Sequence, residues 1–163
     1  MPNPCLVYCK NNRADKAIKM ETIIDNILNK YNWPTRTTVG DKDIEHIEKK
    51  IGFELPNDYK YFLSKYQRHE AQIGKESFNL WDLDNLLSLN EGYEILLNLP
   101  NTIGIGGNGG GEFIGIEKTG IEDFRIILTL FIGLDSADHI EIGRSFTDFI
   151  MSMDNGEKWF KEY

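Results

Sequence analysis

Helical spacing of apolar residues occupies the first part of the chain, and strand patterns follow it. Between residues 20 and 66, apolar side chains recur three and four positions apart in three separate segments, the spacing of one face of an α-helix. Between residues 78 and 142, short apolar runs are interrupted by glycine, asparagine and aspartate, which is typical of strands joined by turns. Helices that precede the strands, rather than alternate with them, predict an α+β fold.

The limits of the expected helices come from residues that start or stop a helix. The first helix is predicted to open at Met20 and to break at Trp33-Pro34, because proline disfavours a helical residue before it. The second starts near Asp41, a suitable N-cap, and ends at Gly52, a left-handed stop. The third begins at Leu55-Pro56. Its buried stripe is predicted to be Tyr59, Phe62, Leu63 and Tyr66.

The expected strands are short, and one further helix follows them. They are predicted at residues 78–81, 103–105, 112–117, 126–132 and 139–142. Residues 126–132 are apolar on both faces, which indicates a central strand covered by helices. The segment 83–99 fits neither pattern clearly. Ser145 and Asp148 form a capping box at the start of the last helix.

Length and composition predict one domain in the cytosol. The chain has 163 residues and 40% hydrophobic residues, enough for a single core without disulfide or metal support. Residues 1–19 lack periodicity and are basic, so we expect a loose N-terminal leader, with a single domain over residues 20–163; Met20 could equally be the natural start. No apolar run has the length of a membrane span or a signal peptide. With two cysteines, this predicts a cytoplasmic protein.

The negative charge is concentrated in the second half of the chain. The formal net charge is -8, and residues 81–163 carry 15 acidic and 5 basic side chains. Such a surface repels nucleic acid and anionic membranes, so neither is an expected partner. It attracts a basic protein and speeds the encounter. Negative charge also serves solubility alone, and the sequence leaves both interpretations open.

The sequence contains no clear catalytic, cofactor or metal motif. Residues 104–109 match the letters of a dinucleotide-binding loop, but a strand rather than a helix follows them, so we interpret them as a hairpin turn built on Asn108-Gly109. Cys5 and Cys9 lack the second pair that a structural zinc site needs. His139 and Glu141 could form a catalytic dyad or an exposed ion pair. We therefore expect a non-enzymatic protein without cofactor or metal.

Acidic residues near the expected strand ends form the candidate partner-binding surface. An acidic rim of this kind is either simply solvated or the docking surface for a basic partner. Trp81, at the end of an apolar strand, is either part of the core or an interface anchor. The candidate residues are Trp81, Asp82, Asp84, Glu112, Asp135, Asp138 and Glu141.

Two adjacent motifs carry a resemblance to a known family. The run IEHIEKKIG at residues 44–52 is followed by LPNDYKYFL at residues 55–63. Together with Trp33, the glycine turn before residues 113–116 and the closing helix, they resemble the SUKH superfamily, whose type example is the yeast cell-wall assembly regulator domain. The resemblance covers about residues 31–153. It implies a twisted, mostly antiparallel sheet packed with N-terminal helices and closed by a C-terminal helix.

The resemblance also implies a function in protein binding. Bacterial members are mostly understood as immunity proteins that neutralise toxin domains, often nucleases, without catalysis or cofactors. The alternative implied by eukaryotic members is a regulatory or scaffold module linked to cell-wall processes. A small hydrolase using His139 and Glu141 is the third hypothesis. The chain departs from the family pattern at Glu117, where an aspartate is frequent, and at residues 67–77, which lack the usual Asn-Gly-Gly.

Overall fold

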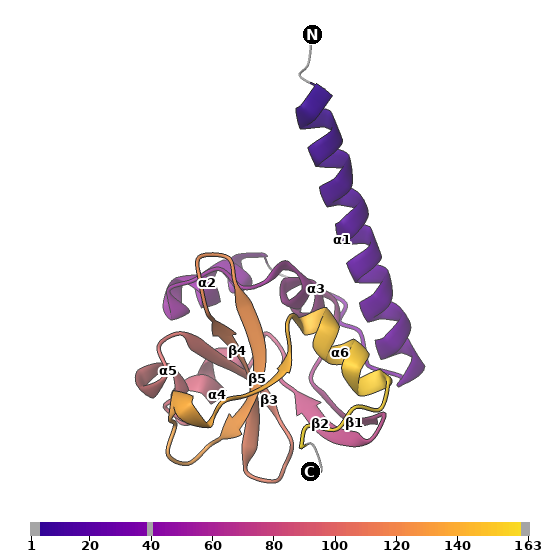
Figure 1. Cartoon of the computed structure of the whole chain (residues 1–163). Helices are drawn as coiled ribbons and strands as arrows, with labels where there is room; N and C mark the ends of the chain where they lie inside the picture. The colour runs from indigo at the N-terminus through magenta and orange to yellow at the C-terminus, as the bar shows by residue number, and fades with distance from the viewer. Residues whose placement is uncertain (1–3, 39–40, 161–163) are drawn as a thin grey trace.

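The computed structural model of the chain describes residues 4–38 and 41–160 (Figure 1). Three helices precede the sheet: α1 (Pro4–Lys30), α2 (Asp41–Ile51) and α3 (Asn57–Lys65). The strands are β1 (His69–Ile73), β2 (Glu76–Leu80), β3 (Thr102–Gly107), β4 (Glu112–Lys118), β5 (Phe124–Leu130) and β6 (Ile140–Gly143). Between and after them lie α4 (Leu86–Gly92), α5 (Ile95–Asn98), η1 (Ser136–Asp138) and α6 (Phe146–Asp154).

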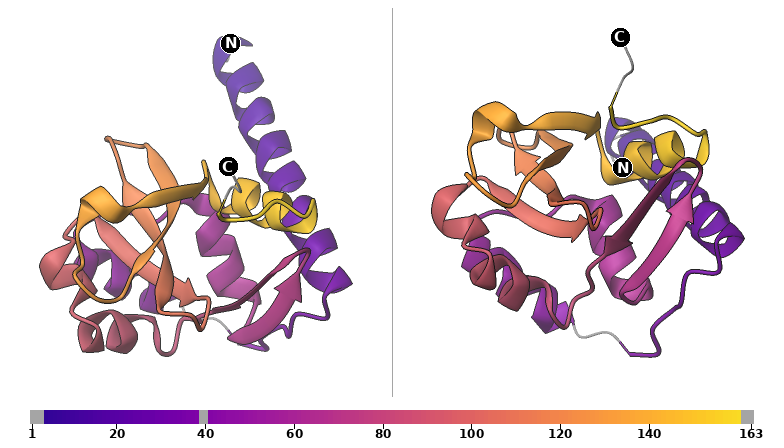
Figure 2. Two further views of the ribbon diagram at one scale, coloured as in Figure 1. Left: turned by 60° about the horizontal axis from the view of Figure 1, so that its bottom comes forward. Right: turned by 90° about the horizontal axis from the view of Figure 1, so that it is seen from below.

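The sheet is a meander in which each strand pairs with its neighbours in sequence. Within the described ranges the order is β1-β2-β3-β4-β5-β6, and every pair is antiparallel. Figure 2 shows the sheet curled, with α4 and α5 packed against β3 and α6 beside β6. The predicted α+β fold, with N-terminal helices and a closing C-terminal helix, is confirmed.

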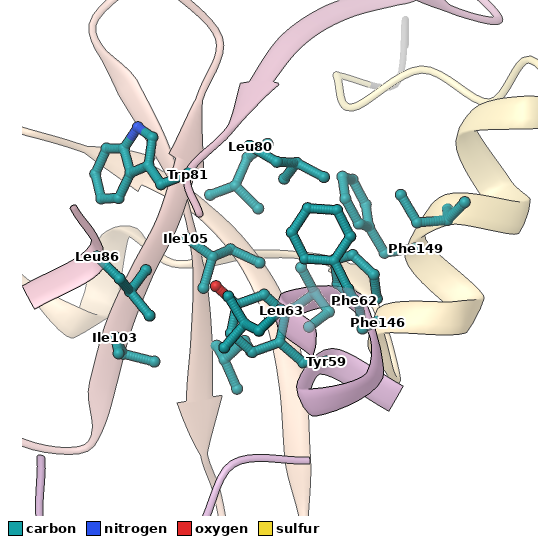
Figure 3. Close-up of a cluster of buried hydrophobic side chains, with 14 of the residues drawn as sticks. Tyr59, Phe62, Leu63, Leu80, Trp81, Leu86, Ile103, Ile105, Phe146 and Phe149 are labelled. Atoms are coloured by element: carbon teal, nitrogen blue, oxygen red, sulfur yellow. The ribbon is translucent and has the colours of Figure 1, made fainter. Parts of the chain in front are cut away.

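Aromatic rings from α3 and α6 fill the centre of the core (Figure 3). The predicted stripe of the third helix is fully buried from Tyr59 to Tyr66. Phe62 lies 5.1 Å from the ring centroid of Phe146, and Phe78 of β2 lies 5.3 Å from that of Phe149. Figure 3 places Trp81 at the opposite side of this cluster from α6. The cluster joins the N-terminal helices, the sheet and the closing helix into one hydrophobic unit.

The first helix is longer than predicted. It begins at Pro4, sixteen residues before Met20, so the predicted helix start at Met20 is wrong and residues 4–19 are helical, while residues 1–3 lie outside the described part of the chain. The buried residues Ile24 and Leu28 pack the C-terminal part of the helix on the core, and no glycine interrupts its extension toward the N-terminus. Residues 12–19 are all exposed, and α1 projects from the domain (Figure 1). The boundary at residue 20 stays a prediction.

Two further differences concern the strands. β1 was not predicted, because its sequence HEAQI is polar and only Ile73 is fully buried. The strand expected at residues 126–132 is β5, which runs from Phe124 to Leu130. Phe131 leaves the sheet and packs on Tyr93, with 4.3 Å between ring centroids.

The segment 83–99, whose sequence fits neither pattern clearly, contains the helices α4 and α5.

The glycine-rich motif belongs to a hairpin, as predicted, but its first four residues are the end of β3 rather than part of the turn. Gly104 and Gly106 lie in β3, where a Cβ on Gly106 would lie 2.1 Å from the main-chain oxygen of Asn79. The turn itself uses positive φ at Gly109 and Gly111, whereas Asn108 accepts a hydrogen bond from the N–H of Gly110. The turn is therefore longer than the two-residue Asn108-Gly109 turn that was expected.

The predicted helix ends are largely confirmed. Gly52 has a φ of +83° and ends α2. Ser145 caps α6 by accepting a hydrogen bond from the N–H of Asp148. Asp148 in turn accepts from the N–H of Arg144, one residue before the position expected in a capping box. α2 begins at Asp41, but the two residues before it lie outside the described ranges, so the cap at Asp41 stays a prediction.

The end of α1 is fixed to α6 and to α3 by two carboxylates. Asp154 of α6 accepts hydrogen bonds from Lys30 and from the hydroxyl of Tyr31, both at 2.7 Å. Asp25 of α1 accepts from Lys65 (2.7 Å) and from the hydroxyls of Tyr61 (2.9 Å) and Tyr66 (2.6 Å). Burial raises the pKa of Asp25, but the hydrogen bonds from Lys65, Tyr66 and Tyr61 outweigh it and lower the pKa below its usual 3.8.

Replacing Asp25 by asparagine is expected to lower the free energy of unfolding by about 1.5 kcal/mol at neutral pH. Because the pKa of Asp25 is lower in the folded than in the unfolded chain, its charge stabilises the fold above the unfolded pKa. This contribution is lost as the pH falls through the folded pKa. The difference between wild type and Asp25→Asn should therefore shrink below about pH 4.

Urea unfolding of both chains from neutral to acid pH measures this difference. Asp15→Asn, an exposed position on the same helix, is the matched control and should change the free energy by less than about 0.5 kcal/mol. A difference between wild type and Asp25→Asn that stays constant into strong acid would contradict the electrostatic explanation.

Candidate functional site

Trp81 lies in the core rather than on the surface. It is 4% exposed, follows the last residue of β2, and its N–H donates to the carbonyl of Ile105. Its ring stacks against Tyr93 at 6.2 Å and against Phe131 at 6.4 Å. Of the two interpretations of Trp81, the core position is the one that the structure shows. Tyr93, which is partly exposed, covers it from the solvent side.

Asp82 and Asp84 lie in the turn after β2, and they differ in role. Asp82 is buried and accepts hydrogen bonds from the N–H groups of Arg68 (3.1 Å) and Asp84 (3.2 Å). Burial, and next the charge of Asp82, raise the pKa of the Tyr59 hydroxyl well above its usual range. Asp82 therefore stabilises the turn from inside. Asp84, with its side chain 82% exposed, points to solvent.

Arg36 approaches both aspartates from the segment before α2. Its guanidinium lies 3.7 Å from Asp82 and 3.5 Å from Asp84, farther than the roughly 2.7–2.9 Å of a charge-assisted hydrogen bond. The Arg36 side chain is 8% exposed. Its Nε is buried and has no hydrogen-bond partner among the described residues. The guanidinium thus keeps unused hydrogen-bonding capacity beside two carboxylates.

Glu112, Asp135 and Asp138 lie on two connections of the sheet. Glu112 accepts a hydrogen bond from the side-chain amide of Asn108 within the β3–β4 turn. Asp135 caps η1 by accepting from the N–H of Ala137, and both Asp135 and Asp138 are exposed. Glu112 and Asp135 thus make hydrogen bonds within their own loops. The exposed Asp135 and Asp138 remain accessible to a partner.

Glu141 lies in a separate group of charged side chains on β4, β5 and β6. Arg125 contacts Glu117 at 2.5 Å and Glu141 at 3.9 Å. The His139 side chain is 1% exposed, and its Nδ1 lies 3.4 Å from Glu117. The prediction of an exposed His139–Glu141 ion pair is therefore wrong, because the His139 side chain is buried and its Nδ1 lies beside Glu117 of β4.

The candidate residues form several groups rather than one cluster. A hydrogen bond from the N–H of Phe131 to the carbonyl of Gly111 joins the connection that carries Asp135 to the turn before Glu112. The stacking of Phe131 on Trp81 links that connection to the start of the β2–α4 turn. Arg36 pairs with Asp82 and Asp84, and Arg125 pairs with Glu141. Among the residues that the structure describes, no ion pair connects these two sets of candidate residues.

Two adjoining pockets between α2 and the β2–α4 turn were not predicted. Asp43 and Asp84 line both of them. The polar pocket has a volume of about 460 Å³ and is lined by Arg36, Thr37 and Asp82 among others. No sequence signal indicates it, because Arg36 and Asp82 are far apart in the chain and meet only in the folded domain.

A sequence model of the SMI1 / KNR4 family (SUKH-1) matches residues 38–152. The match covers well over half of the chain. This chain belongs to the SMI1 / KNR4 family. Among curated proteins, no sequence matches the chain.

Membership of the SMI1 / KNR4 family gives the domain a general role. SUKH domains generally act in immunity or in protein interaction rather than as enzymes. In the described part of this domain, no three His, Cys, Asp or Glu side chains are placed to hold a metal ion. The side chains of Cys5 and Cys9 lie outside the described side chains. None of the helices, as far as they are described, is long and apolar enough to cross a membrane.

Proposed function

We propose that this SMI1 / KNR4 domain is an immunity protein that binds and neutralises a basic protein toxin. The observation that carries the proposal is the position of its negative charge. Asp84, Asp135 and Asp138 are exposed on connections that follow β2 and β5, in the half of the chain with 15 acidic and 5 basic residues. Exposed carboxylates steer a basic partner and fix its orientation.

A nuclease is the toxin class that this charge fits best. An enzyme that cuts nucleic acid needs lysine and arginine side chains at its phosphate-binding surface. An acidic protein that docks there competes with the substrate for the same cations. Neutralisation then needs no chemical reaction by the immunity protein. The enclosed ring of His139 supports a non-enzymatic role, because a general base must reach its substrate.

Replacing Asp84, Asp135 and Asp138 together by lysine is expected to weaken toxin binding at least about tenfold at low salt. The partner is first captured with the tagged chain from the native cell and identified by mass spectrometry at low and at high salt. Calorimetry then measures the affinity of the purified pair. The control variant replaces Glu54, Glu70 and Glu157, three exposed acids elsewhere, by lysine and changes the net charge equally.

Three results would contradict the proposal. The first is a captured set of envelope or regulatory proteins, which would favour the scaffold alternative. The second is a partner that is acidic or whose binding is insensitive to salt. The third is an equal loss of affinity in the two triple variants. That result would mean that the net charge of the chain, and not the position of these three acids, determines the affinity. Rescue of cell growth when the toxin and the wild-type chain are expressed together would confirm neutralisation.

A further inference from the structure

The two pockets beside α2 form one groove with a polar and an apolar end. We call it the α2 groove. Its polar end contains Arg36, Asp43, Asp82 and Asp84. Its other end, about 280 Å³, is lined in equal number by apolar side chains (Ile47, Leu83 and Leu87) and polar ones (His46, Asp43 and Asp84), and we call it the apolar end after the first three. Asp43 and Asp84 belong to both ends, so the carboxylates stand where the two ends meet.

The charge of the polar end is unbalanced. Three carboxylates and one guanidinium line this end, and the Arg36 side chain is nine-tenths buried, with its guanidinium 3.7 Å from Asp82 and 3.5 Å from Asp84. Asp82 is engaged by main-chain N–H groups, whereas Asp84 is 82% exposed. A second cation entering the groove would find Asp43 and Asp84 at its mouth. An incoming phosphate or carboxylate would meet three negative charges.

Arg36 supplies an observation that is independent of the acids. Its Nε is buried without a hydrogen-bond partner among the described residues, although buried donors are nearly always paired. An acceptor on a bound segment, such as a main-chain carbonyl, would supply that partner after a small rotation of the side chain. A peptide that carries lysine or arginine offers both a main-chain carbonyl as an acceptor and a side-chain cation.

The apolar end indicates that the residue next to the bound cation has an apolar side chain. Ile47 and Leu83 are buried, and Leu87 is half-buried, so they form the floor of this end. An apolar side chain placed there would be removed from water and would contribute hydrophobic free energy. A single charged side chain would leave this end empty. The groove therefore fits two neighbouring side chains of different character.

We propose that the α2 groove binds a protein segment in which an arginine or lysine stands beside an apolar residue. The inference rests on the proposed function and names where on the domain the basic partner docks. The cation pairs with Asp43 and Asp84, the apolar side chain packs on Ile47, Leu83 and Leu87, and Arg36 donates to the main chain of the segment.

The probe is the capped dipeptide N-acetyl-Arg-Leu-amide, added to the full ¹⁵N-labelled chain and followed by NMR. We expect the amide signals of residues 43–47 and 83–87 to shift with a dissociation constant in the millimolar range. N-acetyl-Glu-Leu-amide, which has the opposite charge, should leave them in place. Replacing Asp43 and Asp84 by asparagine should weaken the affinity for the Arg-Leu peptide at least about fivefold.

Glu70→Gln with Glu157→Gln is the matched control, because it removes two exposed carboxylates away from the groove and from the proposed partner surface and should leave the affinity unchanged. A native spectrum of each variant shows that it is folded. Absent shifts, equal shifts with the Glu-Leu peptide, or shifts centred on η1 would overturn the proposal. Self-association through the exposed Arg13, Lys16 and Lys19 of a second copy would appear as concentration-dependent shifts without peptide and would also overturn it.

The two experiments distinguish a failure of the groove proposal from a failure of the proposed function. If the groove binds the Arg-Leu peptide but the chain captures no basic partner, the proposed function is contradicted and the groove proposal still holds. A basic toxin whose affinity is unchanged by Asp43→Asn with Asp84→Asn would contradict the groove and leave the proposed function in place.

Discussion

Phe62→Ala is expected to lower the free energy of unfolding by about 4 kcal/mol. Phe62 is fully buried and lies against four other aromatic rings. The ring centroids of Trp33, Tyr59, Tyr66 and Phe146 are 6.4, 6.0, 5.9 and 5.1 Å away. Alanine would leave a cavity between rigid rings from three elements, which cannot collapse into it without shifting α3 or α6.

Urea unfolding followed by tryptophan fluorescence measures this loss. Phe160→Ala removes the same side chain from a position that is half exposed and should cost less than about 1 kcal/mol. If the two variants lost similar free energy, the ring cluster around Phe62 would not be the centre of the core. Should Phe62→Ala fail to fold, Phe62→Leu, with an expected loss of about 1.5 kcal/mol, provides the measurement.

Asn90→Ala is expected to lower the free energy of unfolding by about 3 kcal/mol. Asn90 of α4 is fully buried. Its amide donates to the carbonyls of Leu86 and Gly104, both at 2.8 Å, and its carbonyl accepts from the N–H of Gly104 at 2.7 Å. These bonds serve main-chain groups at the irregular point of β3 between Gly104 and Gly106. Alanine would remove the hydrogen-bond partner of both the main-chain N–H and the carbonyl of Gly104.

Asn98→Ala is the matched control for Asn90→Ala. Asn98 is exposed on α5 and donates one hydrogen bond to the carbonyl of Glu94, so its removal should cost less than about 1 kcal/mol. Hydrogen exchange adds a local measurement, because the amide of Gly104 should lose its protection in Asn90→Ala. Unchanged protection would contradict the assigned role of Asn90.

The helices could be predicted because their pattern depends on one element at a time. The stripe from Tyr59 to Tyr66 spans eight residues, and its members lie on one face of α3 and of the residue that follows it. β1 lacks such a signal, since it is an edge strand whose polar side chains face solvent. The start of α1 was missed for a different reason, because residues 4–19 have no apolar stripe and continue a helix whose packed residues lie farther along the chain.

The candidate site could be predicted only in part. Exposure of Asp84, Asp135 and Asp138 follows from their positions in turns. Burial of Trp81 and Asp82 depends on Tyr93 and Arg36, which are brought there by the packing of other elements. A single sequence does not show those long-range contacts. The α2 groove was missed for the same reason, as its walls come from segments that are separated by the whole of α3 and the first hairpin.

The contact between α1 and α6 sets the order in which the domain can be completed during synthesis. Each strand pairs with the one made just before it, so the sheet can extend as the chain emerges from the ribosome. Lys30 and Asp154, by contrast, are 124 residues apart. Until α6 has been made, the apolar face of α1 and α3 has no cover on that side. We therefore expect nascent chains that end before Phe146 to be the ones that need a chaperone.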